Sequence, residues 1–169
     1  MCCAEARKAT TNSARDMKIF FEPDPARKRE LQERLTAMLP QWFGQPASNA
    51  HYAMQAEILD GYVAESEGIR RGMLLLKWIG PISAEVYWMA VDPNYHRSGV
   101  GRALMEAAIE AARKREARFL FVMTLHPKDP YEPYQRTRRF YEAMGFVHVV
   151  EEQFPANPRN PTAWFMKQL

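Results

Sequence analysis

The residue pattern with the clearest chemical meaning is a glycine turn at residues 96–102, His-Arg-Ser-Gly-Val-Gly-Arg. Gly99 and Gly101 have no side chains, so the backbone there can approach a ligand closely. We expect a strand before this turn and a helix after it, and the unpaired N–H groups at the start of a helix bind anions. Arg97 and Arg102 add positive charge. The turn therefore suits a diphosphate group.

Two other nucleotide-binding motifs fit this turn poorly. A dinucleotide-binding turn needs a third small residue after Gly99 and Gly101, but Leu104 stands at that position. The sequence also has no Gly-Lys-Ser or Gly-Lys-Thr of a P-loop. A purely structural use, in which the two glycines only turn the chain from strand into helix, stays open on the motif alone.

Two segments, residues 84–101 and 140–146, together resemble the signatures of the GNAT superfamily of N-acyltransferases. The first segment ends a strand in Val-Asp-Pro and runs into the turn. The family writes this turn as Gln/Arg-x-x-Gly-x-Gly/Ala, and this chain has His96 at its first position. The second segment, FYEAMGF, is similar to the family's Phe/Leu-Tyr-x-x-x-Gly-Phe. Because both stand in the family's order, separated by one helix and one strand, the pair is far more specific than either alone.

This resemblance implies that acetyl-CoA is the co-substrate, and it implies where acetyl-CoA binds. Backbone groups of Met89 and Val91 would pair with the pantetheine arm, and N–H groups of the turn would hold the pyrophosphate. The strands at 84–91 and 118–125 would separate to make a slot for the thioester. The implied cofactor-binding residues are Met89, Ala90, Val91, His96, Arg97, Ser98, Gly99, Val100, Gly101 and Arg102.

The resemblance also implies roles for two side chains in the transfer of an acetyl group to an amine. Tyr141 would donate a proton to the departing CoA thiolate, and the alternative is a core tyrosine on the apolar face of its helix. Glu85 lies six residues before Val91, the spacing of a strand glutamate that some family members use as the base. The alternative is a solvent-facing glutamate, with water relaying the proton. A backbone N–H near residues 89–91 would polarise the carbonyl.

The amine-binding residues are less well defined by the sequence. Asp129 could attract a cationic amine or cap its own loop, and His126 could be a base or an ordinary loop histidine. Arg136, Arg138 and Arg139 could face an acidic acceptor or the CoA phosphates, or form a solvated helix face. The candidate lining residues are Trp42, Phe43, Tyr52, Tyr87, Thr124, His126, Asp129, Tyr131 and Tyr134.

Hydrophobic periodicity predicts the elements that position these residues. Asp24 followed by Pro25 is typical of a helix start, and Gly145 is typical of a helix end. Strands are predicted at 17–22, 61–65, 73–78, 84–91, 118–125, 146–154 and 162–169, and helices at 25–39, 48–56, 101–116 and 134–144. We therefore expect one α/β (α+β) domain, with a mixed, mostly antiparallel sheet of six to seven strands and about four helices. A helical crossover makes the central pair parallel, and the resemblance implies that this pair is splayed.

The composition limits the class of protein. The chain has 169 residues, of which 47% are hydrophobic and 25% charged, as in one soluble globular domain. A net charge of +3 is small for a nucleic-acid-binding surface. No apolar stretch approaches the roughly 20 residues that span a membrane. Because His, Cys, Asp and Glu do not occur at metal-ligand spacing, no metal is expected.

Residues 1–16 are expected to be a disordered tail before an acetyltransferase domain at 17–169. This tail lacks the apolar region of a secretory signal, and its adjacent Cys2 and Cys3 cannot close a useful disulfide loop, so a cytoplasmic location is expected. The expected acceptor is a primary amine of a small molecule or peptide, and the two C-terminal strands could pair across a homodimer, as in many relatives. A non-catalytic acyl-CoA-binding module of the same fold and a nucleic-acid-binding domain are the alternatives.

Overall fold

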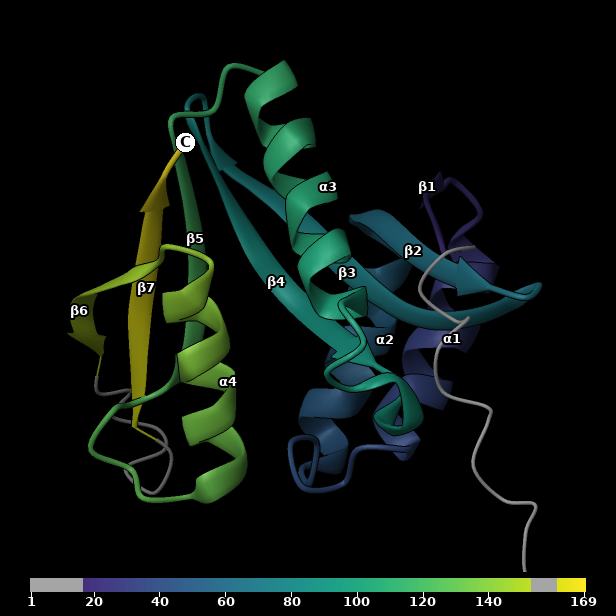
Figure 1. Ribbon diagram of the computed structural model, residues 1–169, viewed down its shortest axis with the longest axis horizontal. Coiled ribbons are helices and arrows are strands. Elements are labelled where there is room, and N and C mark those ends of the chain that lie inside the picture. The colour runs from purple at the N-terminus through teal and green to yellow at the C-terminus, as the bar shows by residue number, and fades with distance from the viewer. Residues whose placement is uncertain (1–16, 153–160) are drawn as a thin grey trace, which may run out of the picture.

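The computed structural model describes residues 17–152 and 161–169 (Figure 1). Its strands form one mixed sheet, against which the helices pack. The predicted tail at residues 1–16 lies outside the described residues. In chain order the elements are β1 (Lys18–Glu22), α1 (Pro25–Ala37), α2 (Pro46–Ile58), β2 (Asp60–Ser66), β3 (Ile69–Gly80), β4 (Ser83–Val91), the 3-10 turn η1 (Pro93–Tyr95), α3 (Val100–Lys114), β5 (Phe119–Leu125), α4 (Glu132–Ala143), β6 (Val147–Glu152) and β7 (Thr162–Gln168).

The seven strands lie in the order β1-β2-β3-β4-β5-β7-β6, and only the central β4–β5 pair is parallel. β4 and β5 pair only through residues 83–86 and 119–122. Beyond this short ladder the two strands diverge, and Figure 1 shows them as the two arms of a V. The predicted α/β fold with a splayed central parallel pair is therefore confirmed.

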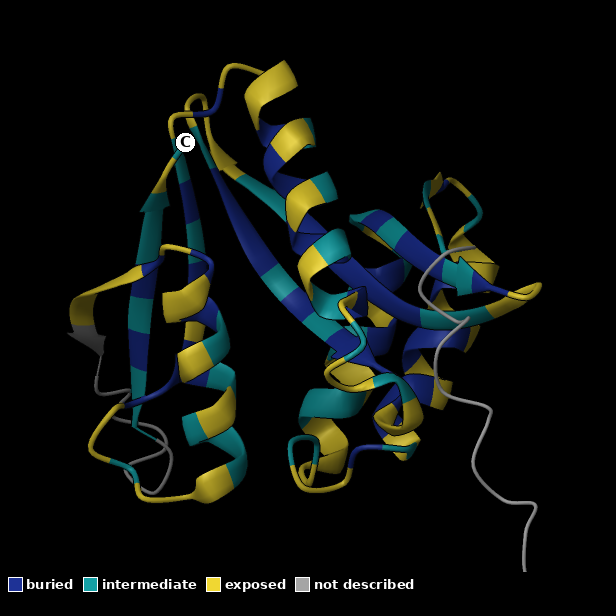
Figure 2. Cartoon of the chain, viewed as in Figure 1, coloured by how far each residue is buried: buried dark blue, intermediate teal, exposed yellow. Residues whose placement is uncertain are grey.

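The sheet is covered on both faces around β3. Leu74 and Leu76 join the core beneath α3, whereas Met73 and Leu75 join the core beneath α1. Successive side chains of a strand point to opposite faces, so the unbroken run at residues 73–76 supplies both cores, and all four residues are fully buried. Figure 2 shows the matching buried stripe along α3. These two cores fix β4 and the start of α3, the elements on which the site is built.

β3 begins earlier than the predicted strand at 73–78 because of its hairpin turn. Glu67 and Gly68 both have positive φ, 55° and 73°, a geometry typical of two-residue hairpins whose twist matches that of the flanking strands. Pairing with β2 therefore resumes at once, at Ile69. Arg70 interrupts the apolar pattern there, which is why hydrophobicity alone does not reveal this part of the strand.

The C-terminal half of the sheet carries α4. This helix begins at Glu132, two residues earlier than predicted, because Pro133 lies in the first turn, where a missing N–H costs little. It ends at Ala143, and Gly145, just after the C-cap residue Met144, has the left-handed conformation that the sequence predicts there, with φ of 83°. β6 forms one edge of the sheet and exposes Val147 and Val150, and the pairing of the two C-terminal strands across a homodimer stays a prediction.

Candidate active site

A cavity of about 710 Å³ lies where β4 and β5 diverge. Residues 86–91 of β4 and 122–124 of β5 line it. The remaining lining residues come from η1 and the glycine turn, from α4, and from the α1–α2 region, mainly the connector at residues 38–45. The cavity therefore brings together both sequence signatures and several of the predicted acceptor residues.

The glycine turn presents backbone N–H groups at the start of α3. Gly99 is the N-cap residue, with φ of 92°, and no side chain of the described residues caps this helix start. A Cβ on Gly99 would meet nothing within 4 Å, so the space beside it is open. Uncapped N–H groups next to open space fit a phosphate group. The turn can therefore accommodate the diphosphate of a nucleotide-bearing ligand.

The residues predicted to bind the cofactor divide into two groups. All of them line the cavity except Ser98 and Val100. The Ser98 hydroxyl donates to the Tyr95 carbonyl at 2.5 Å, and Val100 is fully buried in the core, so both hold the turn in shape. Gly101 lines the cavity but also allows close packing, because a Cβ there would lie 3.2 Å from the Met89 methyl carbon.

His96 occupies the position where this chain departs from the family signature. Its Nε2 lies 2.9 Å from the Val91 carbonyl oxygen, and since a carbonyl only accepts, this nitrogen is the donor. The ring also contacts Trp42 edge-on, with centroids 6.0 Å apart. His96 therefore connects the turn to the end of β4 and to the α1–α2 connector.

Tyr141 is both a core residue and a cavity residue. It is 8% exposed, and its ring packs against Phe140 and Phe146 with centroids 5.6 and 5.8 Å away. Burial, with smaller effects of Tyr134 and Tyr52, raises the pKa of Tyr141 above the ordinary phenol value. Its hydroxyl thus stays protonated at neutral pH and can act as a hydrogen-bond donor in the cavity.

Glu85 is buried, so the alternative of a solvent-facing strand glutamate is wrong. It is 6% exposed and lies opposite Lys77 of β3. Burial raises the pKa of Glu85, and the nearby Lys77 partly offsets this shift. Glu85 is not among the residues that line the cavity, although Val86 and Tyr87, which follow it in β4, are. A proton path from the cavity to Glu85 therefore needs an intermediate, such as water.

An aromatic wall, defined as Phe43, Tyr52, Tyr87 and Trp88, lines the part of the cavity formed by β4, α2 and the α1–α2 connector. Ring centroids are 5.7 Å apart for Phe43–Trp88, 6.3 Å for Phe43–Tyr52 and 5.9 Å for Tyr52–Tyr87. The Tyr87 hydroxyl is 2.8 Å from Nε2 of His51, which holds the outer edge of the wall.

Trp88 is the member of the wall that sequence reasoning missed. Between β3 and β4, Leu75 pairs with Trp88 and Leu76 with Val86, so Tyr87 is an extra residue in the ladder. Such a bulge locally breaks the alternation of faces, and this allows Tyr87 and Trp88 to line the same cavity. No glycine, proline or break in the apolar pattern marks the bulge in the sequence.

A hydrogen-bonded bridge joins the α1–α2 connector to α4 across the cleft. Trp42 Nε1 lies 3.1 Å from the Thr137 hydroxyl oxygen and 3.3 Å from the Pro133 carbonyl oxygen, to which it donates. The Tyr134 hydroxyl donates in return to the Trp42 carbonyl at 3.0 Å. Trp42 and Tyr134, both predicted acceptor residues, therefore link the two arms that the sheet leaves apart.

Three predicted acceptor residues lie outside the cavity lining: His126, Asp129 and Tyr131. Nδ1 of His126 accepts from the Lys128 N–H at 3.0 Å, and the carboxylate of Asp129 accepts from the Tyr131 N–H at 2.8 Å. The loop-capping alternative for Asp129 is therefore the correct one. These contacts shape the loop between β5 and α4, away from the cavity.

The arginines of α4 do not share one environment. Arg138 is buried and donates to the carbonyls of Leu125 and Asp129 at 3.1 and 3.0 Å, so it holds the end of β5 and the following loop. Arg136 and Arg139 are exposed and line the cavity. The prediction of a solvated helix face is therefore wrong for Arg138.

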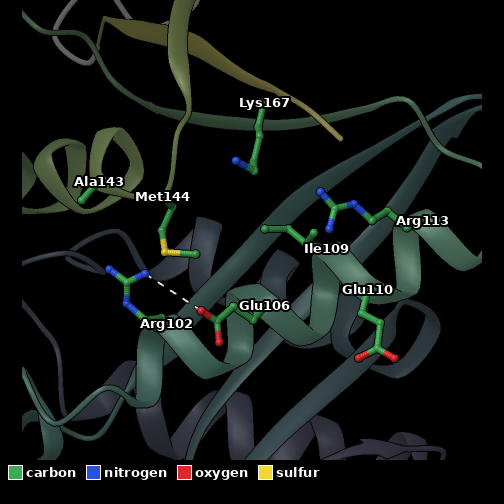
Figure 3. Close-up of a pocket in the computed structure, with 8 residues that line it drawn as sticks. All are labelled: Arg102, Glu106, Ile109, Glu110, Arg113, Ala143, Met144 and Lys167. Carbon is green, nitrogen blue, oxygen red and sulfur yellow. Dashed lines mark ion pairs between the residues drawn. The ribbon is translucent and has the colours of Figure 1, made fainter.

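A second, smaller hollow of about 300 Å³ lies between α3 and the end of α4 (Figure 3). Figure 3 shows Lys167 of β7 and Arg113 of α3 reaching toward it, above Ile109 and Met144. Its two glutamates pair along α3, Glu106 with Arg102 at 3.9 Å and Glu110 with Lys114 at 2.7 Å. Its lining includes Arg102 but neither Gly99 nor Tyr141, so the cavity between β4 and β5 is the candidate active site.

Two further properties concern the described part of the chain. Residues 17–152 and 161–169 contain no group of three or more His, Cys, Asp or Glu side chains arranged to hold a metal ion. Among these residues, no helix is both long enough and apolar enough to cross a lipid bilayer.

Comparisons with known proteins agree with this geometry. No curated protein sequence matches the chain. A protein from Desulfovibrio desulfuricans assigned to the GNAT family superposes with a TM-score of 0.77 at 19% identity, over 90% of this chain and 98% of that one. A GNAT acetyltransferase from Elizabethkingia anophelis with acetyl-CoA bound gives 0.68 at 13% identity, over 92% and 99%. The ribosomal-protein-S18-alanine N-acetyltransferase of Escherichia coli gives 0.69 at 18%, over 89% and 94%.

At these identities the solved structures establish the fold, and the family follows from the sequence itself. The model of the acetyltransferase (GNAT) domain matches residues 58–148, more than half of the chain. The matched segment runs from the end of α2 to β6 and includes both signatures and most of the cavity lining. This chain belongs to the GNAT acetyltransferase family.

Proposed function

We propose that the protein transfers an acetyl group from acetyl-CoA to a primary amine of a small molecule or peptide. The observation that carries this proposal is the convergence on one cavity of the uncapped start of α3, the free edge of β4 and Tyr141. The helix start would hold the diphosphate of CoA, the strand edge would pair with its pantetheine arm, and the protonated phenol would serve its departing thiolate.

The turn and β4 would bind acetyl-CoA mainly through the backbone. Among the described residues, β4 has no strand partner on the β5 side beyond Val86, so its N–H and C=O groups there would be available to the pantetheine arm. N–H groups at the start of α3 would bind the pyrophosphate, and Arg97 and Arg102 would add charge. Of the Met89–Val91 segment, the Val91 carbonyl already accepts from His96, so it would contribute least.

The chemical step forms one C–N bond and breaks one C–S bond. The amine lone pair attacks the thioester carbonyl carbon, and a backbone N–H near residues 89–91 stabilises the charge on its oxygen. As the C–S bond breaks, its electron pair leaves with sulfur, and the Tyr141 hydroxyl donates a proton to that sulfur. The nitrogen loses one proton to a base, so the products are an amide and a free thiol.

Glu85, reached through water, is the base that we favour. An alkylammonium with a pKa of about 10.4 is mostly charged at neutral pH, so its proton must be removed before or during attack. Glu85 is the only carboxylate on β4 and is buried beside the cavity wall, yet it does not line the cavity. Water that ends in bulk solvent, with no part for Glu85, is the competing arrangement.

Binding and turnover of acetyl-CoA test this proposal in two steps. Isothermal titration with acetyl-CoA should give a measurable heat, and a panel of amines should then release free thiol in step with amide formation. An absence of both would refute the proposal. Binding without transfer to any amine would instead support the second candidate, a non-catalytic acyl-CoA-binding module of the same fold. The buried, protonated Tyr141 in the cavity favours the enzyme.

A further inference from the structure

We propose that the amine acceptor is a small aromatic monoamine, a primary amine on an aryl or arylalkyl body, whose ring lies against the aromatic wall. This inference rests on the proposed function, because it names the substrate class of the same site. Three independent properties of the cavity carry it: its enclosure, the chemistry of the wall and the charge of its lining.

The enclosure limits the size of the acceptor. The cavity of about 710 Å³ must hold the pantetheine arm as well as the acceptor. The arm would take up much of this volume and leave space only for a small acceptor. The bridge of Trp42 with Thr137 and Tyr134 then ties the α1–α2 connector to α4 across the cleft. An extended peptide would have to break these hydrogen bonds to pass, whereas a small amine would not.

The wall selects an aromatic body. Phe43, Tyr52, Tyr87 and Trp88 form a chain of ring contacts, and two of the four rings are also held from outside the wall. Trp88 is 4% exposed within the core, and Tyr87 is fixed by its hydroxyl contact with His51. Rings fixed in this way present faces and edges to a planar guest without losing side-chain entropy on binding.

The charge of the lining disfavours an acceptor with several amines. Its charged members among the described residues are four arginines, and none is Asp or Glu. Two of these arginines, Arg97 and Arg102, lie in the turn that would hold the pyrophosphate, but Arg136 and Arg139 are on α4. A polyamine would bring two or more positive charges toward these groups, whereas a monoamine brings one and loses it on reaction.

The test compares four acceptor classes at saturating acetyl-CoA, with thiol release as the readout. The probes are 2-phenylethylamine, 2-cyclohexylethylamine, spermidine and a hexapeptide with a free N-terminal amine. We expect kcat/KM for 2-phenylethylamine to exceed that for its saturated analogue about threefold to tenfold, the range expected of ring–ring contacts. Spermidine and the hexapeptide should be poorer by a larger factor. A preference for spermidine, for the peptide or for the saturated amine would overturn the inference but leave the enzyme intact.

Variants of the wall make the test specific. Phe43→Leu and Tyr52→Leu should each raise KM for 2-phenylethylamine about fivefold to tenfold, with KM for acetyl-CoA unchanged. The matched control is Phe21→Leu, the same substitution at a half-exposed ring on β1, outside the cavity lining. Equal effects on both amines in the wall variants would show that the wall has only a structural role. No thiol release with any amine, despite acetyl-CoA binding, would refute the proposed function and this inference together.

Discussion

The cofactor side of the cleft is made largely of backbone, and the acceptor side is made of side chains. At the turn, the uncapped N–H groups at the start of α3 lie beside open space, in a backbone shape set by Gly99. On the other side, the surface is the aromatic wall, and the bridge of Trp42 and Tyr134 closes it. One side therefore depends on the path of the chain and the other on the identity of particular residues.

This difference separates what is general in the site from what is particular. A backbone site keeps its chemistry when neighbouring side chains change, provided that the turn keeps its φ angles. A side-chain wall changes its preferred ligand with one substitution. We therefore expect changes at the turn to affect the binding of acetyl-CoA whatever the acceptor, and changes at the wall to affect only the choice of amine.

The largest effect is expected for Gly99→Asp. It places a negative charge at the helix start that would hold the pyrophosphate, and repulsion of like charges in a bound complex costs several kcal/mol. A loss of about 4 kcal/mol corresponds to a Kd about 1000-fold weaker, measurable by titration calorimetry. Gly68→Asp is the matched control, because Gly68 also has positive φ and open space, but in the β2–β3 hairpin. An equal loss of affinity for acetyl-CoA in both variants would indicate misfolding. Normal affinity in Gly99→Asp would show that acetyl-CoA binds elsewhere.

Tyr141→Phe tests the one side chain that the cofactor half needs for chemistry. Removing a general acid typically costs about 100-fold in kcat, and we expect KM for acetyl-CoA to stay within about threefold. The ring packing with Phe140 and Phe146 is retained in this variant, so the fold should be unaffected. Tyr62→Phe on β2, outside the cavity lining, is the control. An unchanged kcat would show that Tyr141 is only a core residue, with no part in catalysis.

Glu85→Gln tests whether the acceptor half has a dedicated base. If it does, wild-type kcat/KM falls as the pH drops through the pKa of Glu85, which burial raises above the ordinary value of about 4.3. In the variant, this fall in kcat/KM at low pH should disappear. Its kcat/KM at higher pH, where the wild-type value is constant, should be about tenfold below that of the wild type. Glu30→Gln, at an exposed position on α1, should change neither. If kcat/KM of Glu85→Gln still falls at low pH as in the wild type, the result would favour the water relay.

The same burial gives Glu85 an effect on stability. Because its pKa is higher in the folded protein than in the unfolded chain, the folded state holds the proton more tightly over the interval between the two values. The contribution of Glu85 to stability therefore falls as the pH rises from the ordinary glutamate pKa through the raised one. Denaturant unfolding at several pH values should show this slope in the wild type and a smaller one in Glu85→Gln.

The contrast between the two halves also explains what the sequence can predict. The turn, the positions of the strands along the chain and the parallel central pair all follow from local signals: Gly99 with Gly101, alternating apolar runs, and a helix between two strands. Each signal lies within one short segment, because a turn or a strand is defined by neighbours in the chain. The start of β3 is missed only because Arg70 interrupts its pattern.

The acceptor half could be predicted only in part, because it is assembled from distant segments. Trp42 bonds to Thr137, 95 residues away, and nothing local to either residue indicates that contact. Trp88 enters the wall through a bulge that leaves the apolar pattern unbroken. Conversely, His126 and Asp129 have the right chemistry for an acceptor site, but short-range hydrogen bonds engage them in their own loop. Residue type alone does not distinguish these outcomes.

Two threonines on the C-terminal arm of the cleft give the smallest and most selective test. Thr137 accepts from Trp42 and donates to the Pro133 carbonyl, whereas the hydroxyl of Thr124, also a cavity residue, is buried and has no hydrogen-bond partner among the described residues. Replacing a bonded hydroxyl costs about 1 kcal/mol of unfolding free energy, but removing an unsatisfied one is neutral or stabilising by a similar amount. Thr137→Val should therefore lower stability by about 1 kcal/mol, and Thr124→Val should raise it by up to about 1 kcal/mol.

Kinetics of the same pair show whether the bridge restricts the acceptor. Thr137→Val weakens the tie between the α1–α2 connector and α4, so kcat/KM for the hexapeptide should rise relative to that for 2-phenylethylamine. Thr124→Val leaves the bridge intact and should leave this ratio unchanged. If both variants shift the ratio equally, the hydroxyls act through packing at β5 and α4, and the bridge has no part in selecting the acceptor. A shift in Thr137→Val alone would establish that a contact between distant segments sets the specificity of a site whose cofactor half is made of backbone.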